Sequence, residues 1–491
     1  MIVKIIVIGI YALTIIAVGI YGLRKTKSFN DFFLGGGNVG PWMTAFSYGT
    51  AYFSAVLFIG FAGKIGWSFG YSGLWIALFN ALLGVAMVWA LLGWRIKKMS
   101  SEYKVHTMSE FLEKRYKSKS IKLMSSLVIF IFMIPYTAAV FMGLSYLFKT
   151  NFNIQYEYAL LFMGVFTAVY IVLGGYKSMA VIDMIFGMIM TVGVIILVYF
   201  TVQKGGGFNV ITNTLKDIEP KLTQAIGPPG IFPLLSLIIL TSLAPFAMPQ
   251  LVQKFYAVKD KRSVKIGAFA STFFALLIGG VAYFVGSTTR VFLNPEVTPG
   301  AFIDGKPVFD NLMPELLTNV IPASLSVVIL LLILSASMST LASLVLIASS
   351  SFAKDFYAGY INKNVSDKKL TLLMRFASAF FVFLAVILAL VKFDIIVEIL
   401  GISWGAIGAF FLGPFVWGLF SKKVSKAGGM LSAIIGLLIC IILYGYGKYA
   451  GGTTPWYLTS PGAGSIGMIA SLIINPVVSL FTKPTLPDLN N

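Results

Sequence analysis

One stretch decides the fold: residues 40–54 read Gly40-Pro-Trp-Met-Thr-Ala-Phe-Ser47-Tyr-Gly49-Thr50-Ala-Tyr-Phe-Ser54, and they open an apolar run that extends to about residue 63. A run of this length suits a membrane-spanning helix, which needs about 20 apolar residues. The run begins with Gly-Pro, however, and its middle holds a glycine and several hydroxyl residues. Because an unbroken helix satisfies its own backbone groups, this pattern predicts a span that unwinds within the membrane.

A second apolar run, residues 230–253, carries the same kind of interruption at Thr241, Ser242, Pro245 and Pro249. The two interrupted spans lie five places apart in the order of spans, so they cross the membrane in opposite directions. In transporters built from inverted repeats, the interrupted first helix of each repeat forms the binding site near the midplane. The alternative is purely structural, because glycine and proline are common in membrane helices.

The composition of the whole chain identifies lipid as its solvent. Of its 491 residues, 58% are hydrophobic and 11% are charged, whereas soluble domains are roughly 25% charged. No polar stretch is long enough to link separate domains, so residues 1–491 are predicted to form one all-α polytopic membrane domain. Apolar runs predict about thirteen spans: 2–23, 41–63, 72–94, 122–148, 157–175, 180–202, 230–253, 265–288, 319–350, 371–391, 395–420, 427–447 and 464–482.

The order of the spans predicts four parts within this domain. An extra N-terminal helix at 2–23 precedes a first five-helix repeat at 41–202. A second five-helix repeat follows at 230–420, and two C-terminal helices occupy 427–482.

The basic residues orient the chain. The net charge of +19 would suggest nucleic acid as the partner of a soluble protein, but here the lysines and arginines lie in short segments between apolar runs. Most of the 37 basic residues fall on one side of the predicted topology. By the positive-inside rule this side is cytoplasmic, so the N-terminus is expected outside and the C-terminus inside.

Three connections between spans have features of their own. Residues 203–229 and 289–318, both expected outside, carry glycine and proline signals and are predicted to be ordered caps over a pathway. The run Ser101–Tyr116, with Thr107 and Glu110 near its start, is interpreted as a short amphipathic helix on the membrane surface. A solvated basic loop is the alternative for this run.

Few residues could support catalysis or a transition-metal site. The single cysteine, Cys440, lies within an apolar run, and the single histidine, His106, lies in a loop. This excludes an intramolecular disulfide and argues against histidine-dependent chemistry. We therefore expect a transporter and not an enzyme.

The run 319–350 contains Ser335-Ala336-Ser337-Met338-Ser339-Thr340. Helical spacing places the small and hydroxyl residues Ala336, Ser339, Thr340 and Ser343 on one face. Such a face can let a neighbouring helix approach closely. It can also supply neutral oxygens to a weakly held hard cation.

Asp183 is an ionisable residue about one turn into the span at 180–202. Because charges at membrane depth are rare and costly, it needs a specific role. It could bond neighbouring hydroxyls and guide a cation at the cytoplasmic mouth, or it could be an interfacial carboxylate paired with Lys177.

Several motifs support a resemblance: Ser28-Phe-Asn-Asp-Phe-Phe-Leu-Gly-Gly36, Gly40-Pro41, Gly174-Gly175 before Asp183, Ser339-Thr340, and Lys354-Asp355-Phe-Tyr357. Together they resemble the sodium/solute symporter family, whose members carry proline, pantothenate, sialic acid or sugars. The resemblance covers nearly the whole chain. It implies a LeuT-type fold of five plus five inverted helices, preceded by one helix and followed by two.

The resemblance also implies a sodium site between the break in the first interrupted span and the run at 319–350. Its ligands would be five neutral oxygens, those of the Thr50, Phe53 and Ala336 carbonyls and of the Ser339 and Thr340 hydroxyls. Asp183 falls where the family places a carboxylate linked to sodium release.

The implied solute pocket would be lined by Tyr52, Tyr136, Thr241 and Trp404. Tyr52 stands where proline carriers have an acidic residue, and Thr241 and Pro245 stand where those carriers have aromatic gates. These departures argue against proline as the solute.

We therefore predict a sodium-coupled symporter of the cell membrane that imports a small organic solute by alternating access, with Na+ as the coupling ion and no nucleic-acid partner. The alternative is a proton-coupled or uncoupled carrier on the same scaffold. The sequence leaves the solute, the sodium stoichiometry and the oligomeric state open.

Overall fold

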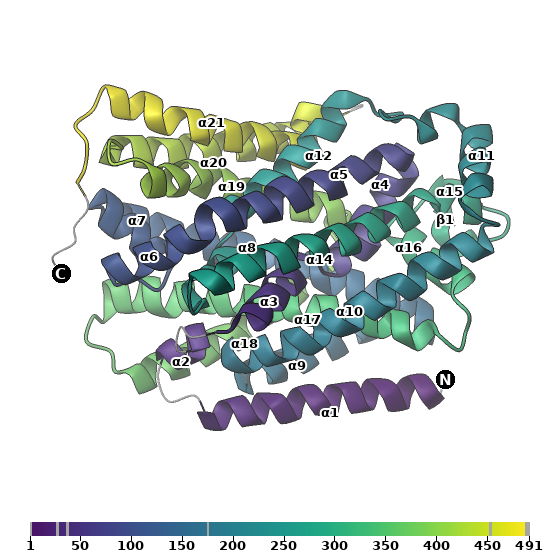
Figure 1. Cartoon of the computed structure of the whole chain (residues 1–491), viewed down its shortest axis with the longest axis horizontal. Coiled ribbons are helices and arrows are strands. Elements are labelled where there is room, and N and C mark those ends of the chain that lie inside the picture. Colours follow the sequence, from purple (N-terminus) through teal and green to yellow (C-terminus); the bar gives the residue numbers. More distant parts are fainter. Residues whose placement is uncertain (1, 26–28, 36–38, 174–175, 451–453, 487–491) are drawn as a thin grey trace.

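The computed structural model describes residues 2–25, 29–35, 39–173, 176–450 and 454–486. Long helices run roughly side by side in an elongated bundle, with the two termini at opposite ends (Figure 1). Ser28, Gly36, Gly174 and Gly175 of the motifs quoted above lie outside the described residues.

The helices that correspond to predicted spans are α1 (Ile2–Lys25), α3 (Pro41–Tyr52), α4 (Ala62–Phe69), α5 (Leu74–Phe79), α8 (Lys119–Phe152), α9 (Tyr156–Leu173), α10 (Tyr176–Lys204), α12 (Ile231–Leu243), α13 (Pro249–Ala257), α14 (Lys261–Ser287), α17 (Ser326–Ser350), α18 (Asp367–Val391), α19 (Ile396–Phe420), α20 (Lys426–Tyr449) and α21 (Ser460–Leu480). Shorter elements are α2 (Phe29–Leu34), α6 (Trp94–Tyr103), α7 (Met108–Tyr116), α11 (Phe208–Ile218), α15 (Thr289–Phe292), α16 (Phe309–Val320), β1 (Phe302–Ile303) and β2 (Lys306–Pro307).

The predicted number of spans is confirmed. Within the described residues, 11 helical stretches are long and apolar enough to cross a membrane. One of them, Val56–Tyr103, holds the second half of the predicted span 41–63 and the whole of the predicted span 72–94, because the chain turns at residues 70–73 between α4 and α5. The remaining predicted span is α9, which is apolar but shorter than the others.

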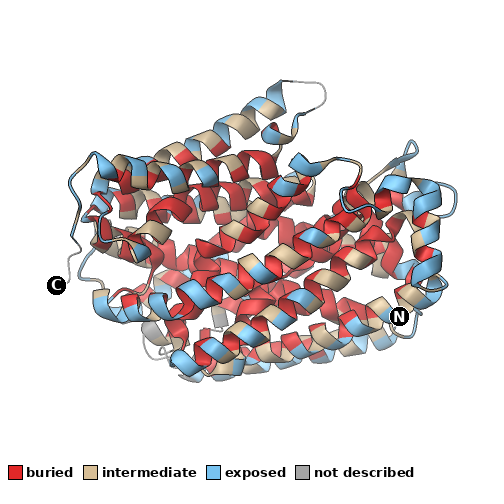
Figure 2. Cartoon of the chain, turned by 45° about the horizontal axis from the view of Figure 1, so that its top comes forward, coloured by how far each residue is buried: buried red, intermediate tan, exposed pale blue. Residues whose placement is uncertain are grey.

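Burial divides the bundle into a centre and a periphery. Figure 2 shows buried residues concentrated in the middle of the bundle and exposed residues along its outside and at its ends. Most of α17 and α19 is buried, whereas α1 is largely exposed along one side of the bundle. Large apolar side chains such as Phe269 and Phe376 point outward, as expected where lipid is the solvent.

The two interrupted spans meet at the end of the bundle that holds the C-terminus. Val39, just before α3, forms a parallel bridge with Val258, just after α13. The Val39 N–H donates to the Ala257 carbonyl at 2.9 Å, and the Lys259 N–H donates to the Val39 carbonyl at 3.2 Å. This backbone pairing fixes the start of one broken span against the end of the other.

The segment Ser101–Tyr116 is not the single surface helix that the sequence predicted. α6 ends at Tyr103, and α7 begins after a capping box in which the Thr107 hydroxyl accepts from the Glu110 N–H at 3.1 Å. Arg115 is only 2% exposed. Its guanidinium donates to the backbone carbonyls of Gly418, Ser421 and Thr485. These three carbonyls compensate the cost of burying the Arg115 charge. α7 can therefore pack into the bundle.

Both long connections are ordered at the end that holds the N-terminus, as predicted for caps. The first contains α11, and the second contains the β1–β2 hairpin and α16. The Asp310 carboxylate of α16 accepts from the Ile396 N–H at 3.2 and 3.4 Å, which caps the start of α19.

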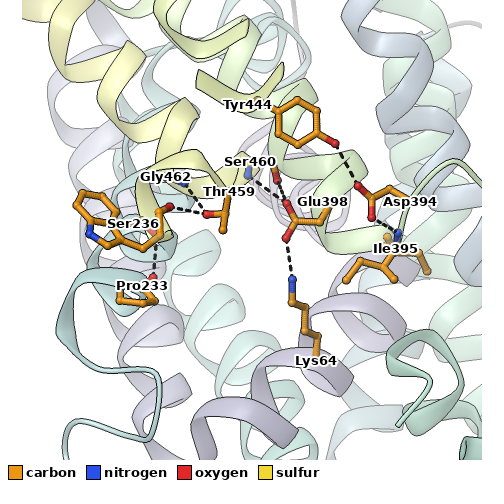
Figure 3. Close-up of polar contacts among 12 residues, drawn as sticks. Lys64, Pro233, Ser236, Asp394, Ile395, Glu398, Tyr444, Thr459, Ser460 and Gly462 are labelled. Atoms are coloured by element: carbon orange, nitrogen blue, oxygen red, sulfur yellow. Dashed lines mark hydrogen bonds and ion pairs between the residues drawn. The ribbon is translucent and has the colours of Figure 1, made fainter. Parts of the chain in front are cut away.

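Charged residues at the same end connect several helices (Figure 3). Lys64 Nζ of α4 lies 2.7 Å from Glu398 Oε1 of α19. Glu398 Oε2 accepts from the hydroxyl and the N–H of Ser460 in α21 at 2.7 and 3.1 Å. Asp394 accepts from the Tyr444 hydroxyl of α20 at 3.1 Å. The second half of the first broken span is thereby held against α19.

Candidate functional site

The first interrupted span breaks where the sequence predicted. α3 ends at Tyr52, and Phe53 is extended, with φ −109° and ψ 135°. A π-helical segment, Val56–Phe61, then leads into α4. The last helical hydrogen bond of α3 runs from the Phe53 N–H to the Gly49 carbonyl at 3.3 Å. Carbonyls in the final turn of a helix have no intrahelical donor, so those after Gly49 become available to other partners.

These carbonyls face Thr340 of α17. The Thr340 hydroxyl oxygen lies 3.3 Å from the carbonyl oxygens of Thr50 and Ala51, and 3.2 Å from that of Phe53. It also lies 3.1 Å from the carbonyl of Ala336, one turn earlier in its own helix. A hydroxyl has one hydrogen to donate, so it can satisfy only one of the four carbonyl oxygens that surround it. Such a concentration of partial negative charge is suited to a cation.

The structure brings together all five residues that the resemblance implied for sodium. Ser339 completes the set, because its hydroxyl oxygen lies 2.8 Å from that of Thr50. All five are fully or almost fully buried. Sequence reasoning missed the Ala51 carbonyl, which joins the group only because the helix ends at the next residue. The small residues also allow α3 and α17 to approach closely, so the packing and coordination interpretations of this face are compatible.

The second interrupted span breaks as well. α12 ends at Leu243, a short 3₁₀ turn covers residues 244–246, and α13 begins at Pro249 after the extended Met248. The hydroxyl of Tyr52 donates to the Thr241 carbonyl at 2.7 Å. This hydrogen bond links the break of the first span to the end of α12.

A cavity with about 360 Å³ of empty space lies between the two breaks. The four predicted solute-contacting residues all line it. The Trp404 ring lies edge-to-face with Tyr52 at 5.8 Å and with Tyr136 at 5.9 Å. The remaining lining residues are Phe53, Ser54, Val56, Leu57, Phe61, Asn80, Tyr283 and Leu400.

The lining of this cavity is aromatic and uncharged. Its polar side-chain groups are hydroxyls, the indole N–H of Trp404 and the amide of Asn80, whose Oδ1 accepts from the Ser242 hydroxyl at 3.2 Å. Asn80 and Tyr283 were missed by sequence reasoning, since nothing in their own spans distinguishes the face that meets the breaks.

Asp183 lies inside the bundle. It is 0% exposed, and its Oδ2 accepts from the Ser47 hydroxyl of α3 at 2.5 Å. The carboxylate also interacts with Ser339. Asp183 therefore lies beside α3 and α17, the two helices that supply the four carbonyl oxygens around Thr340, which we call the carbonyl cluster. The side chain of Lys177, its alternative partner, lies outside the described residues.

Lys254 is a functional candidate that the sequence did not reveal. Because it directly follows the predicted span 230–253, the sequence placed it in the connection between two spans, but the structure places it within α13 at 0% exposure. Its Nζ donates to the Ser343 hydroxyl at 3.0 Å and interacts electrostatically with Asp183. The available signal was the apolar run Phe-Tyr-Ala-Val after Lys254, which separates it from the next charged residue, Lys259.

Known proteins share this sequence pattern. The profile of the Sodium:solute symporter family matches residues 32–436. The osmoregulated proline transporter OpuE of Bacillus subtilis (strain 168) is 26% identical over 493 residues, which cover 98% of this chain and 95% of OpuE. The high-affinity proline transporter PutP of the same organism is 28% identical over 441 residues, 87% of this chain and 89% of PutP.

Solved structures share the fold. A Na+-coupled sialic acid symporter in a substrate-bound outward-open state superposes with a TM-score of 0.81 at 18% identity, covering 98% of both chains. Mhp1, a nucleobase-cation-symport-1 family transporter, superposes in a closed conformation with a TM-score of 0.52 at 11% identity, covering 91% of this chain and 94% of Mhp1. The predicted LeuT-type fold is therefore confirmed.

Proposed function

Because this chain belongs to the sodium:solute symporter family, it is a transporter and not an enzyme, and we propose that sodium binds where the break in α3 faces α17. The function is sodium-coupled symport, and the family gives no support to the proton-coupled or uncoupled alternative. The observation that carries the site is the group of four carbonyl oxygens around the single Thr340 hydroxyl.

In this proposal, sodium is held by the carbonyls of Thr50, Phe53 and Ala336 and by the hydroxyls of Ser339 and Thr340. All are neutral oxygens, which bind a hard monovalent cation reversibly because no fixed charge opposes its release. The Ala51 carbonyl lies close enough to contribute. Sodium at this position would hold the broken span against α17 and so fix the shape of the adjacent cavity.

The solute is proposed to occupy the cavity between the two breaks. Tyr52, Tyr136 and Trp404 offer aromatic surfaces to an apolar body, and Thr241 offers backbone and hydroxyl oxygens. The lining has no charged side chain, so a carboxylate would have to be held by hydroxyls and helix N-termini. We propose a small, compact organic solute. Two of the relatives are proline transporters, and proline belongs among the solutes to be tested despite the differences at Tyr52, Thr241 and Pro245.

Transport by alternating access follows from two repeats rocking against each other, which we place at 41–202 and 230–420. We also place the N-terminus outside and the C-terminus in the cytoplasm of the cell membrane, on the distribution of basic residues. Sodium entering a negative interior then supplies the work, because one charge crossing ~100 mV releases ~2.3 kcal/mol. Asp183, beside the carbonyl cluster, would guide the ion inward.

The test is thermal unfolding of the detergent-purified protein in NaCl and in KCl at equal ionic strength. A cation that binds only the folded state stabilises it by RT ln(1 + [L]/Kd), about 2.7 kcal/mol at one hundred times Kd. We expect sodium-specific stabilisation of the wild type that is lost in Thr340→Ala. Thr137→Ala is the matched control, because Thr137 is buried and donates only to Met133 of its own helix.

Equal stability of the wild type in the two salts would refute the sodium site, and so would full sodium stabilisation of Thr340→Ala. The solute is then sought by sodium-dependent uptake of proline, other amino acids, organic acids and vitamins into proteoliposomes.

A further inference from the structure

Two opposite charges are buried together beside the proposed sodium site. Lys254 of α13 and Asp183 of α10 are both 0% exposed. A buried charge costs several kcal/mol unless it is paired and hydrogen-bonded. Charged residues at membrane depth are therefore expected to have a specific role, and the sodium site described above does not use Lys254.

The two groups share one small polar cluster. Lys254 Nζ donates to the Ser343 hydroxyl at 3.0 Å and lies 4.9 Å from the centre of the Tyr176 ring. Asp183 Oδ2 is occupied by the Ser47 hydroxyl, while Oδ1 has no hydrogen-bond partner within the described residues. The ammonium and the carboxylate attract each other across the cluster.

This cluster is built on the same two helices as the carbonyl cluster. Ser47 is about one turn before Thr50 on α3, and Ser343 is one turn after Ser339 on α17. A carboxylate and two hydroxyls are oxygen donors that suit a hard cation. The position beside them is filled by a cation that belongs to the chain, the ammonium of Lys254.

We propose that Lys254 is a tethered cation that takes the place of a second sodium ion and limits binding to one sodium per protein. The proposal rests on the proposed function and specifies its stoichiometry. The ammonium balances the Asp183 carboxylate while sodium occupies the carbonyl oxygens around Thr340, so this position takes up no second ion from the sodium gradient. The driving force is then that of one ion moving with each solute.

Direct counting of bound 22Na+ on the purified full-length protein tests the proposal. We expect one saturable sodium per wild-type protein. Lys254→Met removes the ammonium and leaves the carboxylate unpaired, so the count should rise to two. Lys254→Met combined with Asp183→Asn removes both charges and should return the count to one. Lys254→Arg retains the charge and should also bind one.

Lys97→Met is the control for the loss of a lysine near the same helix, because Lys97 Nζ donates to the Tyr256 carbonyl of α13 at 3.1 Å. It should leave the count at one. Two sodium ions on the wild type would overturn the proposal, and so would a single ion of unchanged affinity on Lys254→Met. If Lys254→Met cannot be purified in folded form, Lys254→Gln, which also removes the positive charge, takes its place, and a single ion of unchanged affinity on that variant would overturn the proposal. A wild-type count of zero would overturn the proposed function as well.

Discussion

Asp310 should make the stability of this protein depend on pH in an unusual direction. Burial, and to a smaller extent the nearby Asp394, raise the pKa of its carboxyl group, while the Ile396 N–H and Lys64 lower it, and the net pKa is about 7. The pKa in the folded state is thus above the usual 3.8 of the unfolded chain. Between these values the folded state binds the proton more tightly.

The sign and the size of the pH effect on stability follow from the difference between the folded-state and unfolded-state pKa values. The contribution of Asp310 to stability is complete below about pH 4 and is lost as the pH rises through 7. At about 1.36 kcal/mol per pH unit, the total loss is on the order of 4 kcal/mol, of which about 2 kcal/mol falls between pH 5.5 and 8. Asn at this position has a similar shape, stays neutral and can still accept from the Ile396 N–H.

The assay is thermal unfolding at pH 5.5 and pH 8 in fixed NaCl, comparing wild type with Asp310→Asn. We expect the variant to be the more stable protein at pH 8 and to lack this part of the pH dependence. Asp217→Asn, at an exposed position of α11, should retain the wild-type profile. If Asp310→Asn is instead destabilised most at pH 8, the carboxylate is the favoured form and the reasoning is wrong.

Three further predictions concern packing, the cavity and the ion pair. A Cβ on Gly286 would lie 2.1 Å from the Ala62 carbonyl oxygen, so Gly286→Ala should destabilise by about 1–3 kcal/mol or more. Gly280→Ala in the same helix meets open space and should be neutral or stabilising, and equal unfolding temperatures for the two would contradict this. Tyr52→Phe removes the hydrogen bond to Thr241, worth about 1 kcal/mol, and should raise the solute KM severalfold while sodium stabilisation persists. Lys64→Met leaves Glu398 without its cation and should lower the unfolding temperature. Adding Glu398→Gln should recover most of this loss, whereas a double variant in which the effects of the two substitutions simply add would count against the ion pair.

Hydropathy and residue chemistry along the chain were sufficient for the large-scale architecture. The spans, the two interruptions and the ordered caps depend on local sequence, because a helix in lipid must satisfy its own backbone and must be about 20 residues long. The break at Phe53 lies within the stretch of glycine and hydroxyl residues that predicted it. The residues around Thr340 came from the family resemblance, and the structure brings them together.

Only the tertiary structure decides which faces of the helices meet. Lys254 reads as the start of a basic loop, yet α13 continues past it and turns its ammonium towards Ser343 and Asp183. Arg115 reads as part of a surface helix, yet its acceptors are carbonyls contributed by residues after 417. Both charges are tolerated only because partners distant in sequence compensate their desolvation. Local sequence determines whether a segment crosses the membrane, but the environment of a charged side chain depends on the helices that pack around it.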